Sequence, residues 1–265
     1  MTALSKWKDS LRLFFADRAT QIKGMPTIED LCYISGREPR LWTQPEMYAD
    51  LIKNLLFQMD ATSQSSILEV GCAAGFIAKG IAPLVKHYVG VDLARPALRA
   101  ARLLQLPNAD FRYAEGGKLP FADDSFDAVF CYDVFTNFPQ FADGAPIINE
   151  IVRVVRPGGK AVIGSIPNGA RQLAYEERVK QFTAELDARF GPRKEAYGES
   201  TGLTRRIRHW WTKTDPLVSC YYFRAEDFTS LGSKLGVHVA ITDIHPLNPY
   251  VTYRFNAVYT KTPNP

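Results

Sequence analysis

The chain has 265 residues, of which 46% are hydrophobic and 23% are charged, close to the averages for soluble globular domains. This composition excludes a disordered chain and a collagen-like repeat, and the length is sufficient to bury a core without disulfide support. The net charge of +4 is mild, whereas nucleic-acid binders usually carry a concentrated basic face. A nucleic-acid partner is therefore not expected.

The four cysteines are widely spaced and form no Cys-x-x-Cys pair, so neither a disulfide framework nor a metal site is expected. Free thiols are typical of a reducing compartment. The N-terminal stretch lacks the uninterrupted apolar core of a signal peptide, and no run approaches the about 18 apolar residues of a membrane span. We therefore expect a cytoplasmic protein without membrane contact.

The first 65 residues are predicted to be helical and rich in loops. Apolar residues recur at helical spacing from Leu4 to Phe15 and again over 46–59, which indicates two amphipathic helices. The dipeptide Met25-Pro26 and the stretch 35–45 are interpreted as connections, and a polar linker follows the second helix.

The middle of the chain alternates strands with helices. Five strands are predicted, at 67–70, 87–92, 110–114, 126–132 and 160–166. Three helices are predicted between them, at 76–85, 95–104 and 147–155. Such alternation favours right-handed crossovers and a parallel sheet.

This rhythm breaks after the fifth predicted strand. The segment 169–216 is too long for a simple connection and contains a long charged helix candidate at 172–190. Beyond it we predict a helix at 225–235 and two strands, at 237–244 and 253–261. The two strands are interpreted as an antiparallel pair that closes one edge of the sheet.

A run of small residues, Glu69-Val70-Gly71-Cys72-Ala73-Ala74-Gly75, follows the first predicted strand and opens a helix. Small residues let a ligand approach the backbone closely, and a helix N-terminus offers free N–H groups. The spacing differs from the Gly-x-Gly-x-x-Gly of dinucleotide sites. A carboxylate just before the first glycine suits a cationic amino group and would repel a pyrophosphate.

A second carboxylate, Asp92, ends the second predicted strand. An acid at this place can accept hydrogen bonds from the hydroxyls of a ribose. Together with Glu69 it describes a ligand that joins an amino acid to a nucleoside. The alternatives are a surface acid beside a tight turn for Glu69 and a helix cap for Asp92.

These motifs resemble the class I S-adenosylmethionine-dependent methyltransferase family, of the small-molecule type with a methyltransferase domain 11-like core. The resemblance extends from about Ser66 to Pro167 and includes the stretches Leu119–Asp127 and Arg153–Gly159. It implies an α/β fold, a doubly wound seven-stranded Rossmann-like sheet whose last strand is antiparallel, with added helical cap segments. It also implies S-adenosylmethionine as cofactor and S-adenosylhomocysteine as product.

The resemblance further implies a set of cofactor-binding residues. They are Glu69, Gly71, Ala73 and Gly75 for the methionine part, Asp92 for the ribose, Leu93, Glu115 and Gly116 for the adenine, and Tyr132 near the methionine. Two positions depart from the family pattern. Ala73 stands where a central glycine is usual, and Gly116-Gly117 replaces the commoner Ala-Glu.

A catalytic base is less visible in the sequence. Methyl transfer from a sulfonium is an in-line displacement that an enzyme can promote by holding donor and acceptor together, and a base is needed only where the acceptor arrives protonated. The weak candidates are Tyr132, Asp133, His209 and His245. For the two histidines, the alternatives are a surface position and a turn position.

Residues 1–65 are expected to form an N-terminal helical lid that helps to bind the acceptor, and 66–168 the cofactor-binding core. We expect 169–216 to be a helical cap insertion and 217–265 to complete the core sheet, all within one domain. Candidates for the acceptor pocket are Tyr33, Trp42 and Trp210, with core packing as the alternative.

The expected function is methyl transfer to an oxygen or nitrogen of a small-molecule acceptor, of a natural-product or sugar type. One alternative is an RNA methyltransferase of the same fold, since the stretch 204–214 combines cations with aromatics, as nucleic-acid binders do. The other alternative is a non-catalytic protein that binds the cofactor.

Overall fold

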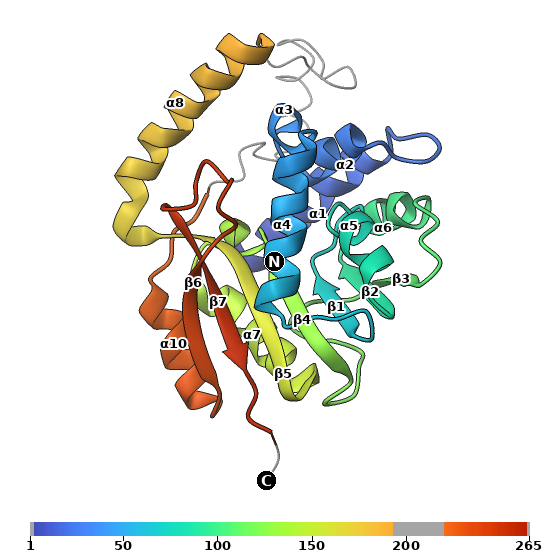
Figure 1. Ribbon diagram of the computed structural model, residues 1–265, viewed down its shortest axis with the longest axis vertical. Helices are drawn as coiled ribbons and strands as arrows, with labels where there is room; N and C mark the ends of the chain where they lie inside the picture. The colour runs from blue at the N-terminus through green and yellow to red at the C-terminus, as the bar shows by residue number, and fades with distance from the viewer. Residues whose placement is uncertain (1–2, 193–219, 264–265) are drawn as a thin grey trace.

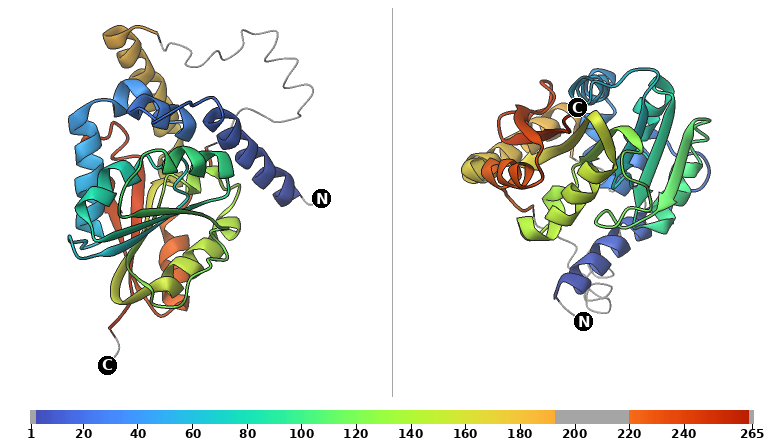
Figure 2. Two further views of the ribbon diagram at one scale, coloured as in Figure 1. Left: turned by 90° about the vertical axis from the view of Figure 1, so that its right-hand side faces the viewer. Right: turned by 90° about the horizontal axis from the view of Figure 1, so that it is seen from below.

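A computed structural model describes residues 3–192 and 220–263, with the side chains of 3–8 left out. The described chain forms a seven-stranded sheet between two layers of helices (Figures 1 and 2). The strands are β1 (Ser66–Val70), β2 (His87–Asp92), β3 (Ala109–Tyr113), β4 (Phe126–Tyr132), β5 (Val155–Pro167), β6 (His238–Asp243) and β7 (Arg254–Thr260).

The order of strands across the sheet is β3-β2-β1-β4-β5-β7-β6. The pairs among β1 to β5 are parallel, while β7 pairs antiparallel with both β5 and β6. Six strands therefore run in one direction and β7 runs against them, which confirms the predicted doubly wound sheet. The predicted C-terminal pair is also confirmed, with β7 inside the sheet and β6 at its edge.

Nine α-helices are described. They are α1 (Ala3–Ala19), α2 (Ile28–Ser35), α3 (Pro39–Trp42), α4 (Pro45–Gln58), α5 (Ala78–Ile81), α6 (Arg95–Arg102), α7 (Phe141–Val154), α8 (Gln172–Phe190) and α10 (Ala225–Lys234). Short 3-10 turns lie at Ala82–Leu84, Phe135–Asn137 and Gly169–Arg171.

Two hydrophobic clusters, one on each face of the sheet, form the core. On one face, Leu51 of α4 and Leu98 of α6 pack with Tyr88 of β2. On the other, Ile148 of α7 and Phe228 of α10 pack with their own set of strand residues. Burial of apolar area on both faces explains why the central strands are almost continuously hydrophobic.

Helix α3 lies within the stretch 35–45 that was expected to be a connection, and α2 lies between the two expected connections, where no helix was predicted. Thr27 and Asp30 form a capping box at the start of α2, in which each side chain accepts a hydrogen bond from the other residue's N–H. The Glu38 carboxylate accepts from the N–H of Arg40 (3.1 Å) at the start of α3. These caps stabilise helices whose short apolar pattern is too weak to predict them.

The helix expected at 76–85 is shorter than predicted. It consists of the single α-turn of α5 and a 3-10 turn that contains Pro83, because proline lacks the N–H that an α-helix interior requires. In contrast, α7 begins at Phe141, six residues earlier than the helix predicted at 147–155.

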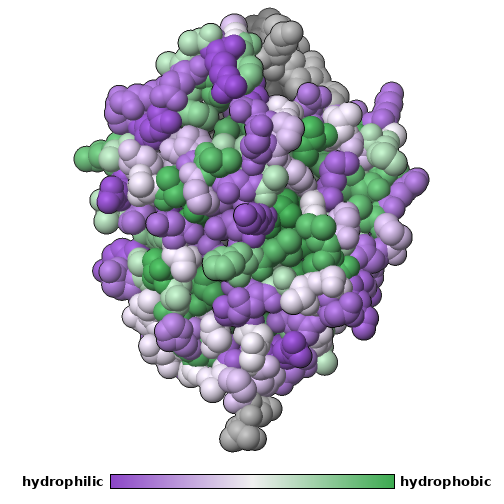
Figure 3. Space-filling model, in the orientation of Figure 1, coloured by the Kyte–Doolittle hydropathy of each residue, from purple (hydrophilic) through white to green (hydrophobic). Residues whose placement is uncertain are grey.

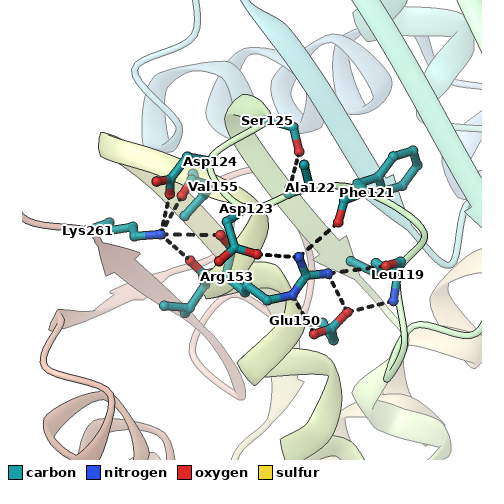
Figure 4. Close-up of polar contacts among 11 residues, drawn as sticks. Leu119, Phe121, Ala122, Asp123, Asp124, Ser125, Glu150, Arg153, Val155 and Lys261 are labelled. Carbon is teal, nitrogen blue, oxygen red and sulfur yellow. Dashed lines mark hydrogen bonds and ion pairs between the residues drawn. The ribbon is translucent and has the colours of Figure 1, made fainter.

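Two stretches of the family resemblance, Leu119–Asp127 and Arg153–Gly159, contact each other at the end of the sheet where β4 and β5 begin (Figure 4). The Arg153 guanidinium donates to the Phe121 carbonyl (2.9 Å) and the Asp123 carboxylate (2.7 Å). Its Nε donates to Glu150 (2.7 Å), which in turn accepts from the Leu119 N–H (2.7 Å). These contacts tie the loop before β4 to the end of α7, so their role is structural.

Lys261, just beyond β7, completes this network. Lys261 Nζ donates to the Asp124 carboxylate (2.6 Å) and to the Val155 carbonyl (3.0 Å). The contact joins the last strand to the loop before β4 and to the start of β5 (Figure 4). We name Glu150, Arg153 and Lys261 with their partners the amino-end network.

The surface in the view of Figure 3 mixes hydrophilic and hydrophobic side chains, with a larger hydrophobic area to the right of its middle. Across the part of the chain that the structure describes, no helix has the length and apolar character to cross a membrane.

Candidate active site

A cavity of about 640 Å³ opens at the carboxyl ends of β1, β2 and β4. Its volume lies in the range of small-molecule sites, and β1 and β4 mark the point where the strand order reverses, the usual ligand position in doubly wound sheets. Phe14 and Phe15 of α1 and Phe182 and Leu186 of α8 also line it. A segment before β1 and a segment between β5 and β6 thus contribute to the wall.

The loop after β1 is held against the end of β2. Gly71 has a φ of +85°, and a Cβ there would lie 2.5 Å from the Val134 Cγ2 atom, so only glycine fits. The N–H groups of Gly71 and Cys72 both donate to the Val91 carbonyl (2.8 and 3.1 Å). These two N–H groups therefore shape the loop, and the free N–H groups expected at the start of the following helix stay a prediction.

Ala73 lies in the same loop and lines the cavity. Its φ is +45°, a region that costs an L-residue about 1–2 kcal/mol and explains why glycine is usual in this place. Its N–H donates to the Asp92 Oδ2 atom (2.8 Å). The hydrogen bond helps to hold alanine in this backbone conformation.

Asp92 lines the cavity and also organises its surroundings. Its Oδ1 accepts from the Ala94 N–H (2.8 Å), so it also acts as the cap that was considered as an alternative. A carboxylate has about four lone-pair sites, and two are used by the N–H groups of Ala73 and Ala94. Both oxygens therefore keep capacity for a ligand hydroxyl. Burial raises the pKa of Asp92, although its backbone hydrogen bonds oppose the shift.

Glu69 lies behind the cavity wall rather than on it, with 3% of its surface exposed. Its Oε2 accepts a short hydrogen bond from the Tyr88 hydroxyl. Burial raises the pKa of Glu69 to about 7, while the bond from Tyr88 opposes this shift. Gly75 is likewise absent from the wall. A direct cofactor contact of these two residues stays a prediction.

The other predicted cofactor residues do reach the cavity. The wall includes Leu93, Glu115, Gly116 and Tyr132. A Cβ on Gly116 would lie 2.9 Å from Val70 Cγ1, so a larger residue would need the wall to move. The structure therefore brings seven of the nine predicted cofactor residues together, and their binding roles stay predictions.

A charged cluster forms a second part of the wall, beyond β4. Asp133 follows β4 with a φ of +60°, and its two oxygens accept from Arg37 Nη2 (2.7 Å) and Arg254 Nη1 (3.1 Å). Arg254 also donates to Ser165 Oγ (2.8 Å) and to the Tyr175 hydroxyl (2.5 Å). We name these five residues the acceptor-side cluster, and all of them line the cavity.

The sequence indicated only Asp133 of this cluster. Arg37 follows the glycine that ends α2, and Arg254 begins β7, so neither belongs to a motif. The one available signal was Asp133 itself, because a carboxylate at the buried end of a central strand requires positive partners.

The remaining candidates for the acceptor pocket and the catalytic base differ in whether they reach the cavity. Trp42 lines the cavity, whereas Tyr33 is buried away from it and Arg18 lies over its ring. His245 is fully buried between Asp50, which contacts Nδ1 at 2.9 Å, and Asn248, which contacts Nε2 at 3.0 Å. Both nitrogens therefore already have partners, and His245 itself does not line the cavity although Asn248 does, so a role for His245 as base is not supported. His209 and Trp210 lie outside the described residues.

The comparisons with known proteins agree with this geometry. Residues 68–163 match the family model described as a methyltransferase domain. The chain is 34% identical over 191 residues to a ubiquinone biosynthesis O-methyltransferase of Albidiferax ferrireducens, which covers 60% of this chain and 71% of that protein. It is 32% identical over 124 residues to the protein of the same name from Alkalilimnicola ehrlichii, over 45% of this chain.

The chain spans about half the length of the Alkalilimnicola relative, 49%. Among solved structures, the fold is similar to that of the DhpI–SAM–HEP complex, with a TM-score of 0.59 at 14% identity over 95% of this chain and 96% of that one. Sequence motifs, sheet topology and relatives agree. The chain belongs to the class I S-adenosylmethionine-dependent methyltransferase family.

Proposed function

We propose that this protein transfers the methyl group of S-adenosylmethionine to an oxygen or nitrogen of a small-molecule acceptor. The observation that carries the proposal is one cavity whose wall holds seven of the nine predicted cofactor residues and also the acceptor-side cluster beyond β4. Relatives named as O-methyltransferases favour oxygen as the atom that is methylated.

The residues of the first part fit this cofactor. When bound, S-adenosylmethionine supplies an electrophilic methyl group on a sulfonium. Asp92 would hold the ribose hydroxyls with its unused lone pairs, and Leu93 and Gly116 would flank the adenine. Glu69, buried behind the loop, would attract the cationic amino group in its ionised form, which the positive charge of that group would itself favour.

The second part of the wall supports catalysis through positioning. Both oxygens of Asp133 already accept hydrogen bonds, and burial raises the pKa of the Tyr132 phenol, which makes its anion harder to form at neutral pH. We therefore propose that Tyr132 and Asp133 orient the acceptor. Holding two reactants at near-attack distance can supply a large part of such a rate enhancement.

We also propose that the chain works as one domain in which 1–65 and 169–216 cover the core of 66–168 and 217–265, a division of which 193–219 lie outside the described residues. The presence of α1 and α8 residues on the cavity wall supports this arrangement, since covering segments exclude water from a reaction. The four free cysteines, three of them buried, support a reducing and therefore cytoplasmic setting.

The test has two stages. Calorimetric titration with S-adenosylmethionine and S-adenosylhomocysteine first measures binding, which we expect for both. A panel of phenolic, sugar and amine acceptors is then assayed for release of S-adenosylhomocysteine. A reaction with protein and S-adenosylmethionine but no acceptor is the blank. Absence of binding to both nucleosides would contradict the proposal. Release that depends on RNA alone would favour the RNA alternative.

A further inference from the structure

The acceptor-side cluster and the neighbouring Tyr132 contain buried polar atoms that lack hydrogen-bond partners. Within the described part of the chain these include the Tyr132 hydroxyl, Arg37 Nε and Arg254 Nε. Tyr132 is only 4% exposed, and all three side chains line the cavity. A buried polar group without a partner costs about 1–3 kcal/mol, so three of them around one carboxylate indicate a missing partner.

The chemistry of the orphaned atoms defines that partner. A guanidinium nitrogen can only donate a hydrogen bond, and a phenol can donate one. The cluster therefore lacks acceptors and has a surplus of donors. In addition, among the described residues the two guanidiniums share the carboxylate of Asp133 as their ion-pair partner, so positive charge is locally in excess. Another nearby carboxylate, Glu38, is paired with Arg40 (3.0 Å).

We propose that the methyl acceptor carries an oxyanion, a carboxylate or a phosphate, that binds to Arg37, Arg254 and Tyr132. Such a group supplies the missing acceptor oxygens and neutralises the surplus charge. Guanidiniums suit both anions, because their planar donors match the oxygens of either. Trp42 and Tyr250 line the same cavity, so an aromatic body attached to the anion would find apolar contacts. This inference rests on the proposed function, whose acceptor class it specifies.

The test measures the binding of small probes to the full-length protein saturated with S-adenosylhomocysteine. Benzoate and phenyl phosphate carry the two oxyanions, and benzamide is the neutral counterpart of benzoate. Ligand-observed NMR titrations give the dissociation constants. We expect at least one anion to bind about tenfold more tightly than benzamide. A hydrogen bond to a charged group typically changes a dissociation constant by a factor of about ten or more. The stronger of the two anions identifies the chemistry of the group.

Three variants locate the site. Arg37→Gln should weaken anion binding about tenfold without changing the binding of benzamide. Arg37→Lys keeps the positive charge and should restore part of the preference for the anion over benzamide. Arg156→Gln is the matched control, because Arg156 pairs with Asp127 at the opposite end of the sheet. Unchanged affinity for S-adenosylhomocysteine shows that each variant is folded.

The outcomes separate the two proposals. If S-adenosylhomocysteine does not bind to the unmodified protein, the proposed function fails. If it binds but neither anion is preferred over benzamide, or if Arg37→Gln leaves the preference intact, the oxyanion site is wrong and the methyltransferase proposal stands.

Discussion

At the scale of single residues, Asp92 has two tasks. It lines the cavity, and it anchors the N–H groups of Ala73 and Ala94. Such a residue is difficult to interpret from sequence, where ligand binding and helix capping were alternatives. The structure shows that they are compatible, because each carboxylate oxygen uses only one lone pair for the backbone.

Replacement of Asp92 tests this dual role. Asp92→Ala should weaken S-adenosylhomocysteine binding by about 10-fold to 100-fold, because it removes a charged acceptor and frees the loop. Asp92→Asn retains one acceptor oxygen and should lose less affinity for S-adenosylhomocysteine. Calorimetry measures both, with Asp110→Ala on β3 as control, since Asp110 pairs with Arg112 outside the cavity wall. Equal affinity of Asp92→Ala and the unmodified protein would exclude a ribose contact.

Glu69 predicts a pH dependence of stability. Its pKa is raised from an ordinary value of 4.5 to about 7 in the folded protein, so the native state binds more protons than the unfolded state between these two values. The free energy of unfolding contributed by this group therefore falls as pH rises from about 4.5 to 7. At about 1.4 kcal/mol per pKa unit the loss is of the order of 3 kcal/mol.

The variant Glu69→Gln removes this titration and keeps an oxygen that can accept from Tyr88. Its free energy of unfolding relative to the unmodified protein should increase with pH across the same window and level off above it. Urea unfolding at several pH values measures the difference. A difference that is constant from pH 4.5 to 8 would mean that the carboxyl has its ordinary pKa.

At the scale of elements, the helices outside the core determine how closed the cavity is. Arg40 connects two of them, because Nη1 donates to the Asp187 carboxylate (2.6 Å) and to the Gly191 carbonyl (2.8 Å) while Nε donates to Glu38 (3.0 Å). The link joins α3 to the end of α8. Figure 1 shows α8 extending from the sheet toward α3 at the top of the molecule.

Arg40→Gln should loosen α8 while leaving the sheet intact. A partly exposed ion pair contributes about 0.2–1 kcal/mol, and with the additional carbonyl contact we expect amide exchange in the last turns of α8 to accelerate several-fold. Hydrogen–deuterium exchange of peptides from 172–190 measures the effect, with β4 peptides as internal reference. Exchange that stays unchanged in both regions would show that the link does not hold the helix.

The elements also differ in how well the sequence predicts them. The strands β1, β2 and β4 lie within a residue or two of their predicted bounds, because apolar runs followed by glycine or acid are strong local signals. Helices α2 and α3 were missed, since eight and four residues are too few for a clear period. Arg37 and Arg254 were missed because their role depends on a contact with Asp133 that only the folded chain creates.

At the scale of the whole molecule, the sheet separates two functions. The cavity lies at the carboxyl ends of the strands, whereas the amino-end network lies where β4 and β5 begin (Figure 4). Both sets of residues produce family-like motifs in the sequence, which alone cannot distinguish a ligand contact from a structural one. Their places in the fold separate the proposed ligand contacts from the structural ones.

This separation predicts that stability and binding can be changed independently. Arg153→Gln leaves Glu150 without its ion-pair partner and breaks bonds to two carbonyls, so unfolding should become easier by about 1–3 kcal/mol. Its affinity for S-adenosylhomocysteine should not change. At a hundredfold excess over its dissociation constant the ligand should still add about 2.7 kcal/mol to the free energy of unfolding.

Asp92→Ala should show the complementary behaviour, with a reduced ligand-dependent gain in the free energy of unfolding at the same ligand concentration. The two sites lie at opposite ends of the sheet and share no partner. The free-energy effects of such substitutions usually add, within about 0.5 kcal/mol. The double variant should therefore combine the lower stability of Arg153→Gln with the weak ligand response of Asp92→Ala. Urea unfolding of the four proteins, with and without ligand, measures this. A loss of ligand response in Arg153→Gln alone would mean that the two ends of the sheet are coupled.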